Sequence, residues 1–244
     1  MTTVDGTVYR ERRPPAGLAA HVACLWDRDA PPGDPATVRV IPDGCADIVW
    51  QHAGGDVTAF VAGPDSRVQF AELPAGARMA GVRFAPGVAA SVLGVPLDEV
   101  RDRRVPLGEL WSGTIAGELA ERAAMSGEPA VVLAAAAQAR ITEPPDAATD
   151  AIVRTLERAS GTGVIAILAG ELGLSERQLH RRCLTMFGYG PKTLQRVLRF
   201  QRALRLARRG GRLAEVAAVS GYADQAHLAR ETRRLAGVPL TQLV

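Results

Sequence analysis

The sequence has little cysteine, few aromatic residues and almost no lysine. Lys192 is the single lysine, so arginine carries nearly all of the positive charge. The three cysteines, Cys24, Cys45 and Cys183, are odd in number, far apart and without a C-x-x-C pair. This spacing favours neither a disulfide framework nor a zinc site, and it fits a reducing compartment.

Long apolar runs are also missing. The longest, around residues 130–137, is alanine-rich and too short to cross a bilayer, and residues 1–15 lack the apolar core of a signal peptide. We therefore expect a cytoplasmic protein without a membrane partner. A hydrophobic fraction of 47% indicates that the chain folds around a core.

The charged residues are distributed unevenly. Residues 151–244 hold 16 basic and 6 acidic residues, a net charge of +10, whereas residues 1–150 hold 13 and 20, a net charge of −7. A basic half joined to an acidic half is typical of a protein in which one domain meets a polyanion. The alternative is an ordinary solvated basic surface.

From residue 7 to about residue 84, short β-prone runs alternate with turn residues. Pro, Gly and Asp recur roughly every ten residues. The β-prone runs between them include residues 38–41, 47–50, 57–62 and 80–84. This pattern predicts an antiparallel sheet or small barrel, preceded by a helix over residues 15–23.

After this region the hydrophobic period changes to that of helices. We predict a short helix over residues 88–93 and longer ones over 110–124 and 129–141, with apolar faces that pack on the sheet or on a partner chain. Residues 142–146, Thr-Glu-Pro-Pro-Asp, cannot continue a helix and have the composition of a linker.

The fold class predicted from these patterns is α+β. A small β-rich, barrel-like regulatory domain covers residues 1–110, a helical connector and linker cover residues 111–149, and an all-α domain covers residues 150–244. In the all-α domain, Asp150 is a suitable N-cap and Pro191 a suitable first helical residue. The predicted helices of this domain are 151–160, 164–171, 176–187, 191–209, 213–220 and 225–236, with a last turn after Pro239.

Two segments of the all-α domain share one plan. In the first, Ala169 is a small residue where two helices cross, Gly173 makes the turn, and Ser175 with Gln178 forms a capping box. In the second, Asp224 caps the corresponding helix. The long helix between them would hold the two units so that they enter successive major grooves about one helical turn apart.

Polar side chains face outward on the second helix of each unit. Arginine can pair with guanine and glutamine with adenine in the major groove, so these faces are suited to reading bases. The candidate DNA-binding residues are Ser175, Arg177, Gln178, His180, Arg181 and Arg182 in the first unit and Asp224, Gln225, His227, Arg230 and Arg234 in the second.

Four motifs of this domain occur in order: GLSERQLHRR at 173–182, FGYGPK at 187–192, RFQRA at 199–203 and GYADQAHLAR at 221–230. Together they resemble the DNA-binding domain of the AraC/XylS transcription regulators, over about residues 150–244. The resemblance implies a double helix-turn-helix. It also implies that the two recognition helices carry Arg177, His180, Arg181, Gln225, His227 and Arg230.

The N-terminal half carries IPDGCADIV at 41–49, GVRFAPG at 81–87 and LGVPL at 93–97. These motifs resemble a β-rich domain of unassigned function that often precedes this DNA-binding domain. Because such regulators commonly sense a small molecule, Asp43, Asp47 and Arg83, at predicted strand ends, are candidate ligand-binding residues. The alternatives are that Asp43 caps its own turn and that Asp47 and Arg83 form an internal ion pair.

We therefore expect a bacterial transcription regulator, an activator or a repressor, that is associated with the nucleoid when bound to DNA. Its candidate partners are double-stranded promoter DNA, RNA polymerase, a small-molecule effector and a second copy of the chain. We expect no catalytic residue, no metal and no cofactor.

Three alternatives remain open, and the first belongs to the same functional class. The first is a DNA-binding regulator whose N-terminal domain only dimerises or docks a partner, with no ligand. A metal-dependent cupin-like enzyme would need clustered histidines, yet His21 and His52 are the only two in this half and form no H-x-H motif. A methyl-accepting repair regulator would need activated cysteines with metal-type spacing, which Cys24 and Cys45 lack.

Overall fold

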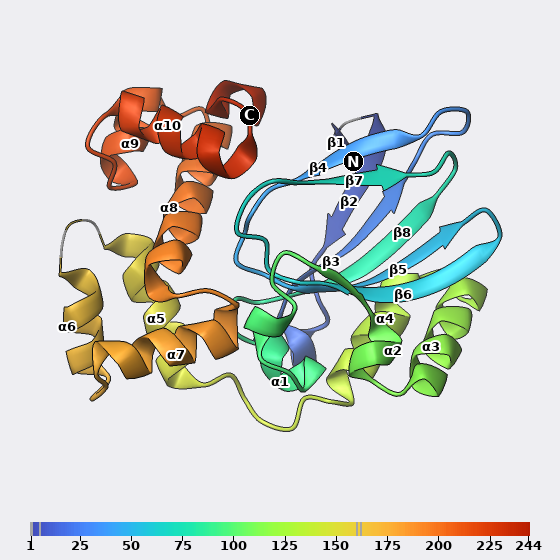
Figure 1. The fold of residues 1–244 in the computed structure, drawn as a ribbon. Helices are drawn as coiled ribbons and strands as arrows, with labels where there is room; N and C mark the ends of the chain where they lie inside the picture. The colour runs from blue at the N-terminus through green and yellow to red at the C-terminus, as the bar shows by residue number, and fades with distance from the viewer. Residues whose placement is uncertain (1, 5, 160, 162) are drawn as a thin grey trace.

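The computed structural model describes residues 2–4, 6–159, 161 and 163–244, and Figure 1 shows how they are arranged. The β-strands gather in the N-terminal half and the C-terminal half is helical, which confirms the predicted α+β class. Within the described residues, none of the helices has the length and apolar character that crossing a membrane requires.

A seven-stranded antiparallel sheet forms the centre of the N-terminal half, in the order β1-β2-β3-β8-β5-β6-β9. Its strands are β1 (Thr2–Val4), β2 (Thr7–Arg12), β3 (Val22–Asp29), β5 (Asp47–Ala53), β6 (Asp56–Ala62), β8 (Arg78–Phe84) and β9 (Arg104–Pro106). A separate antiparallel pair, β4 (Ala36–Val40) and β7 (Gln69–Leu73), lies across one face of this sheet (Figure 1).

Helices cover the opposite face of the sheet (Figure 1). They are α1 (Ala89–Leu93), α2 (Leu107–Leu110), α3 (Gly113–Met125) and α4 (Pro129–Gln138), with short 3₁₀ turns η1 (Ala16–Leu18) and η2 (Leu97–Glu99). Because side chains alternate along a strand, Ile48 and Trp50 of β5 and Val82 and Phe84 of β8 point to these helices and share one core with Leu133. The residues between them point to the other face.

Two predictions for this half were wrong. Residues 15–23 do not form one helix, because Ala16–Leu18 make a 3₁₀ turn and Val22 begins β3. Gly17 weakens a helix here, and pairing with β8 buries Val22 on the sheet instead. The helix predicted from residue 110 begins at Gly113, because the backbone of Trp111 is extended.

The C-terminal half consists of α5 (Ala147–Arg158), α6 (Val164–Glu171), α7 (Glu176–Phe187), α8 (Pro191–Arg208), α9 (Leu213–Val219), α10 (Gln225–Ala236) and the 3₁₀ turn η3 (Leu240–Gln242). The ends of α6 to α10 agree with the predicted ones to within one residue. Helix α5 begins earlier than predicted because Asp146, not Asp150, is its N-cap and accepts a hydrogen bond from the Ala148 N–H at 3.1 Å. The predicted end at Ser160, and Thr162 in the break that follows, lie outside the described residues.

Gly63→Ala should destabilise this fold. A Cβ at Gly63 would lie 1.8 Å from the carbonyl oxygen of Val100, so the backbone has to shift. We expect the free energy of unfolding to fall by roughly 1–3 kcal/mol. The measurement is the thermal unfolding midpoint.

Gly117→Ala is the matched control for that substitution. Gly117 lies in α3 with open space around its Cβ position, and alanine is favoured over glycine in a helix by about 0.5–1 kcal/mol. The midpoint should therefore rise for this variant. An unchanged midpoint for Gly63→Ala would contradict the close approach to Val100.

Candidate nucleic-acid interface and ligand cavity

Helices α6 and α7 form the first helix-turn-helix unit. Leu168 and Ala169 of α6 pack in one core with Leu179 of α7. The Ser175 hydroxyl accepts a hydrogen bond from the Gln178 N–H at 3.3 Å, and the Ser175 N–H donates to Gln178 Oε1 at 2.8 Å. The predicted capping box is therefore present, and Gln178 remains exposed.

The outward face of α7 carries Arg177, His180 and Arg181, all exposed. Arg182 is different, because it is half-buried and its guanidinium forms an ion pair with Asp146, the N-cap of α5. Arg182 therefore holds α5 against α7, and the exposed residues before it form the accessible basic face.

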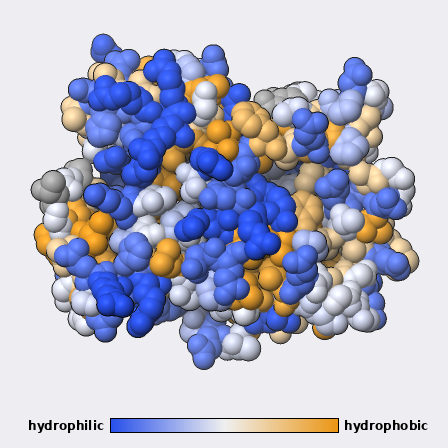
Figure 2. Space-filling model, viewed as in Figure 1, coloured by the Kyte–Doolittle hydropathy of each residue, from blue (hydrophilic) through white to orange (hydrophobic). Residues whose placement is uncertain are grey.

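Helices α9 and α10 form the second unit. Asp224 Oδ1 accepts a hydrogen bond from the His227 N–H at 2.6 Å and so caps α10. Gln225, Arg230 and Arg234 are exposed on α10. Figure 2 shows hydrophilic side chains gathered over both α7 and α10 on the face that it views.

Helix α8 connects the two units and binds the second through specific contacts. The Arg199 guanidinium lies 4.4 Å from the centroid of the Tyr222 ring, and the His227 ring packs edge-on against the same ring at 5.2 Å. Arg196 Nε donates to the Glu231 carboxylate of α10 at 2.8 Å. These contacts fix how α10 sits on α8.

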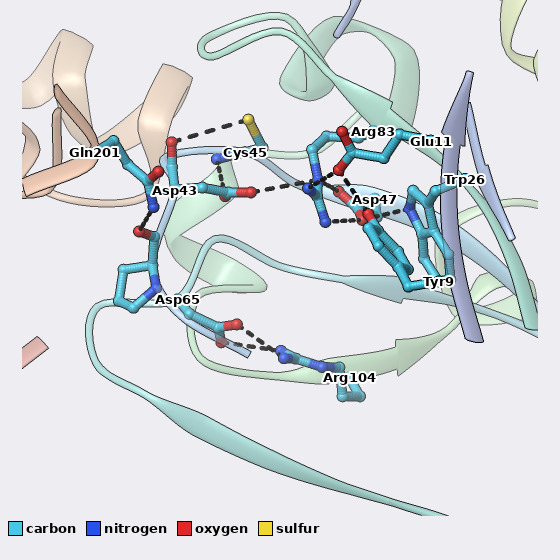
Figure 3. A network of polar contacts seen from close by, with 11 residues as sticks. Tyr9, Glu11, Trp26, Asp43, Cys45, Asp47, Asp65, Arg83, Arg104 and Gln201 are labelled. Carbon is cyan, nitrogen blue, oxygen red and sulfur yellow. Dashed lines mark hydrogen bonds and ion pairs between the residues drawn. The ribbon is translucent and has the colours of Figure 1, made fainter. Parts of the chain in front are cut away.

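The three predicted ligand-binding residues lie together (Figure 3). Asp47 and Arg83 are directly opposite one another in the register of β5 and β8, and Arg83 donates to the Asp47 carboxylate from Nε at 3.2 Å and from Nη2 at 3.1 Å. Asp43 Oδ2 lies 3.3 Å from Arg83 Nε, and Asp43 Oδ1 accepts a hydrogen bond from the Cys45 N–H at 2.9 Å. The turn cap and the internal ion pair that we held as alternatives are thus both present.

Three residues that we did not predict complete this cluster. Glu11 lies 3.7 Å from Arg83 Nη1, the Tyr9 hydroxyl donates to Glu11 at 2.8 Å, and Trp26 Nε1 donates to Asp47 Oδ2 at 2.9 Å. They come from β2 and β3. No motif of the sequence signals them, because only the strand order β2-β3-β8 brings them close to Arg83.

Burial and charge set the protonation of this cluster. Burial raises the pKa of Asp47 above its usual value, and Arg83 opposes that shift. Burial alone would lower the pKa of Arg83, but Asp47 and Asp43 carry it well above its usual value. Burial also raises the pKa of Cys24 to about 12 and that of Cys45 well above its usual value.

The cluster lines an open cavity of about 1880 Å³ between the seven-stranded sheet, the β4–β7 pair and the C-terminal helices. Its wall mixes apolar and charged side chains, and Gln201, Leu204, Arg208 and Leu243 line it from the C-terminal half. In the part of the chain that the structure describes, no group of three or more His, Cys, Asp or Glu side chains is placed to hold a metal ion.

Both halves of the chain match known protein families. Residues 168–244 match a helix-turn-helix domain, and residues 10–106 match a domain of unknown function, DUF6597. No curated protein matches the chain.

Solved structures with a similar fold include two of ToxT from Vibrio cholerae. One is 13% identical over 90% of this chain and 97% of ToxT, with a TM-score of 0.48. The other, bound to an unsaturated fatty acid, is 13% identical over 88% of this chain and 87% of ToxT, with a TM-score of 0.42. A DNA-binding transcriptional dual regulator from Escherichia coli K-12 is 23% identical over 42% of this chain and 92% of its own, with a TM-score of 0.36.

The helix-turn-helix match covers both units described above, from α6 to the end of the described chain. The chain therefore carries an AraC-type helix-turn-helix domain behind a domain of unknown function, and it is a DNA-binding transcription regulator.

Proposed function

We propose that this regulator reads double-stranded promoter DNA with α7 and α10 and thereby changes transcription by RNA polymerase. The observation that carries the proposal is that each unit presents a capped helix with exposed basic side chains, and that the two units lie at the two ends of the connecting helix α8 (Figure 1). Exposed arginines supply affinity through phosphates, and the two helices supply specificity through base edges. The protein acts in the cytoplasm, on the nucleoid, and no enzymatic step is involved.

The eleven predicted DNA-contact residues divide into two groups in this proposal. The exposed side chains that read bases are Arg177, His180 and Arg181 on α7 and Gln225, Arg230 and Arg234 on α10. The residues that position these helices are Ser175, Gln178 and Asp224 as caps, Arg182 through Asp146 and His227 through Tyr222. Residues 150–244 form the DNA-binding part, and residues 1–110 with the connector 111–149 form the regulatory part.

The regulatory part binds a small-molecule effector in the cavity beside Asp43, Asp47 and Arg83. The support is a concave site of about 1880 Å³ in which a few convergent polar groups lie among apolar side chains, as is usual for small-molecule sites.

Selection of bound duplexes from a random library, with the full chain at fixed salt, tests DNA reading. We expect one enriched motif with two submotifs about one helical turn apart. Failure of the full chain to enrich any motif would mean that the two helix-turn-helix units are scaffolds, which contradicts the proposal.

Arg181→Ala and Arg230→Ala should each relax the preferred base within one submotif. Loss of a bidentate arginine–guanine pair removes about 1–3 kcal/mol of discrimination against the wrong base. Arg122→Ala is the control, since Arg122 is an exposed arginine on α3, in the N-terminal half. Equal loss of affinity on every sequence for Arg181→Ala and Arg230→Ala would assign these residues to phosphates instead of bases.

A metabolite that occupies the cavity should raise the thermal unfolding midpoint of the full chain. At a free concentration 100 times the Kd, binding to the folded state adds about 2.7 kcal/mol. Ala71→Trp, which places an indole in the cavity wall, should abolish the shift, whereas Ala124→Trp, on the exposed surface of α3, should leave it unchanged. A metabolite library without any shift would favour a domain that only dimerises or docks a partner.

A further inference from the structure

The turn of residues 41–45 lies between the cavity and α8 (Figure 3). Ile41 packs against the core of the C-terminal helices. The carbonyl oxygen of Pro42 accepts a hydrogen bond from Gln201 Nε2 of α8 at 2.6 Å. The turn precedes β5 in the sequence, yet it contacts the helix that joins the two DNA-binding units.

Gly44 brings the backbone of this turn close to α8. Its φ is +84°, and a Cβ there would lie 3.6 Å from Tyr189 Oη and 3.8 Å from Leu198 Cδ2. Tyr189 is buried, and its hydroxyl has no hydrogen-bond partner among the described residues. The turn therefore packs, without a side chain of its own at Gly44, on the side chains of Tyr189 and Leu198.

Asp43 joins this turn to the cavity. One carboxylate oxygen caps the turn at the Cys45 N–H, and the other faces Arg83, which lines the cavity. The donors of Arg83 already face carboxylates, so a polar ligand beside Arg83 has to compete with one of them. Glu11 is the most exposed of the three carboxylates, but it faces Nη1 and lies on β2, away from the turn. Of the two that meet Nε, Asp47 is 9% exposed and also held by Trp26, whereas Asp43 is 28% exposed, so a ligand that approaches Nε displaces Asp43 more easily than Asp47.

We propose that occupancy of the cavity acts on α8 through the turn of residues 41–45, with Asp43 as the residue that passes the change from Arg83 to the turn. This inference rests on the proposed effector site. When the ion pair between Asp43 and Arg83 is exchanged for a ligand contact, the turn loses one of its two anchors. Its contacts with Gln201 and Leu198 then weaken.

The first DNA-binding unit is attached to the N-terminal half at a different place. Arg101 Nη1 donates to the Gly188 carbonyl oxygen, at the end of α7, at 2.9 Å. A Cβ at Gly188 would lie 2.6 Å from Pro64 Cγ and 3.0 Å from the Leu97 carbonyl oxygen, so the end of α7 is packed tightly against these residues. Helix α8 keeps the core that it shares with α5 and α7. Weakening the turn therefore leaves the end of α7 in place and loosens only the contact of α8, which carries α9 and α10, with the N-terminal half. The separation of the two recognition helices changes as a result.

Asp43→Asn separates the two contacts of Asp43, because asparagine keeps an acceptor for the Cys45 N–H and removes the charge opposite Arg83. The matched control is Asp27→Asn, since Asp27 pairs with Arg12 at 3.1 Å in the same sheet. In the full chain, we expect Asp43→Asn to speed hydrogen–deuterium exchange in residues 41–46 and in α8. We expect its affinity for a duplex with both submotifs to change by about threefold to tenfold, and its affinity for the α7 submotif alone to stay constant.

Gln201→Ala removes the contact of the turn with α8 from the side of the helix. Gln201 also lines the cavity, but this variant leaves the ion pairs of Arg83 unchanged. It should produce the same two effects, and the double variant should show no more than the larger single effect, because both act through one turn. Suppose that the parent protein enriches a two-part site. The inference is then overturned if Asp43→Asn shows the same hydrogen–deuterium exchange and the same DNA affinity as Asp27→Asn. If the parent protein enriches no DNA site in the duplex selection, the proposed function is contradicted instead. The rate of hydrogen–deuterium exchange in α8 then still tests the role of the turn. If Asp43→Asn does not fold, the hydrogen–deuterium exchange and DNA affinity of Gln201→Ala test the inference in its place.

Discussion

The ion pairs of Arg83 join the sheet, the cavity and the DNA-binding helices. Its guanidinium meets Asp47 on the neighbouring strand and Asp43 in the turn that rests on α8. Removing one partner of a buried pair costs about 3–5 kcal/mol, because the other charge is left unpaired, yet apolar residues of equal volume often stabilise a fold as well or better. The charges therefore contribute something besides stability. They form a contact in the cavity wall that a polar ligand can exchange.

The basic charge of the C-terminal half serves two purposes. Arg182, Arg196, Arg199 and Arg208 bind partners within the chain and hold helices, turns and the C-terminal segment in position. Arginine suits this task because its planar guanidinium can stack on a ring and donate several hydrogen bonds at once. The exposed arginines of α7 and α10, together with exposed ones between the helices such as Arg209 and Arg212, are left for DNA. The net charge of the segment thus indicated the right class of partner but overstates the number of side chains that can meet phosphates.

Features set by neighbouring residues could be predicted from the sequence. The starts of α7 and α10 follow from Ser175 and Asp224, whose side chains cap the helix within the next three residues. The start of α5 could not be predicted as well, because Asp146 and Asp150 are both suitable caps. The structure uses Asp146, which also forms an ion pair with Arg182, a residue far along the sequence.

The polar cluster around Arg83 could also be predicted only in part. Asp43, Asp47 and Arg83 could be selected because polar residues at strand ends are common in binding sites, but their mutual contacts depend on the register of β5 and β8. Trp26 joins them through β3, whose first two residues fall in the helix that was predicted over residues 15–23. The cavity and the contact of Pro42 with Gln201 depend on how the two halves pack, which no local pattern encodes.

The DNA-binding part contacts the N-terminal half at two places, and these differ in the free energy needed to break them. The turn of residues 41–45 holds α8 through one hydrogen bond from Gln201 and through the packing of Ile41 and Gly44, and a hydrogen bond of this kind contributes about 0.5–1.5 kcal/mol net. The end of α7 is held by Arg101 and also by the buried side chain of Phe187, which packs so closely on Gly87 that a Cβ there would lie 2.7 Å from Phe187 Cε1. Coupling between two sites in a protein is typically worth about 1–3 kcal/mol. An effector in the cavity therefore has enough free energy to release the turn and too little to detach α7, so regulation acts on the separation of the recognition helices instead of on the whole domain.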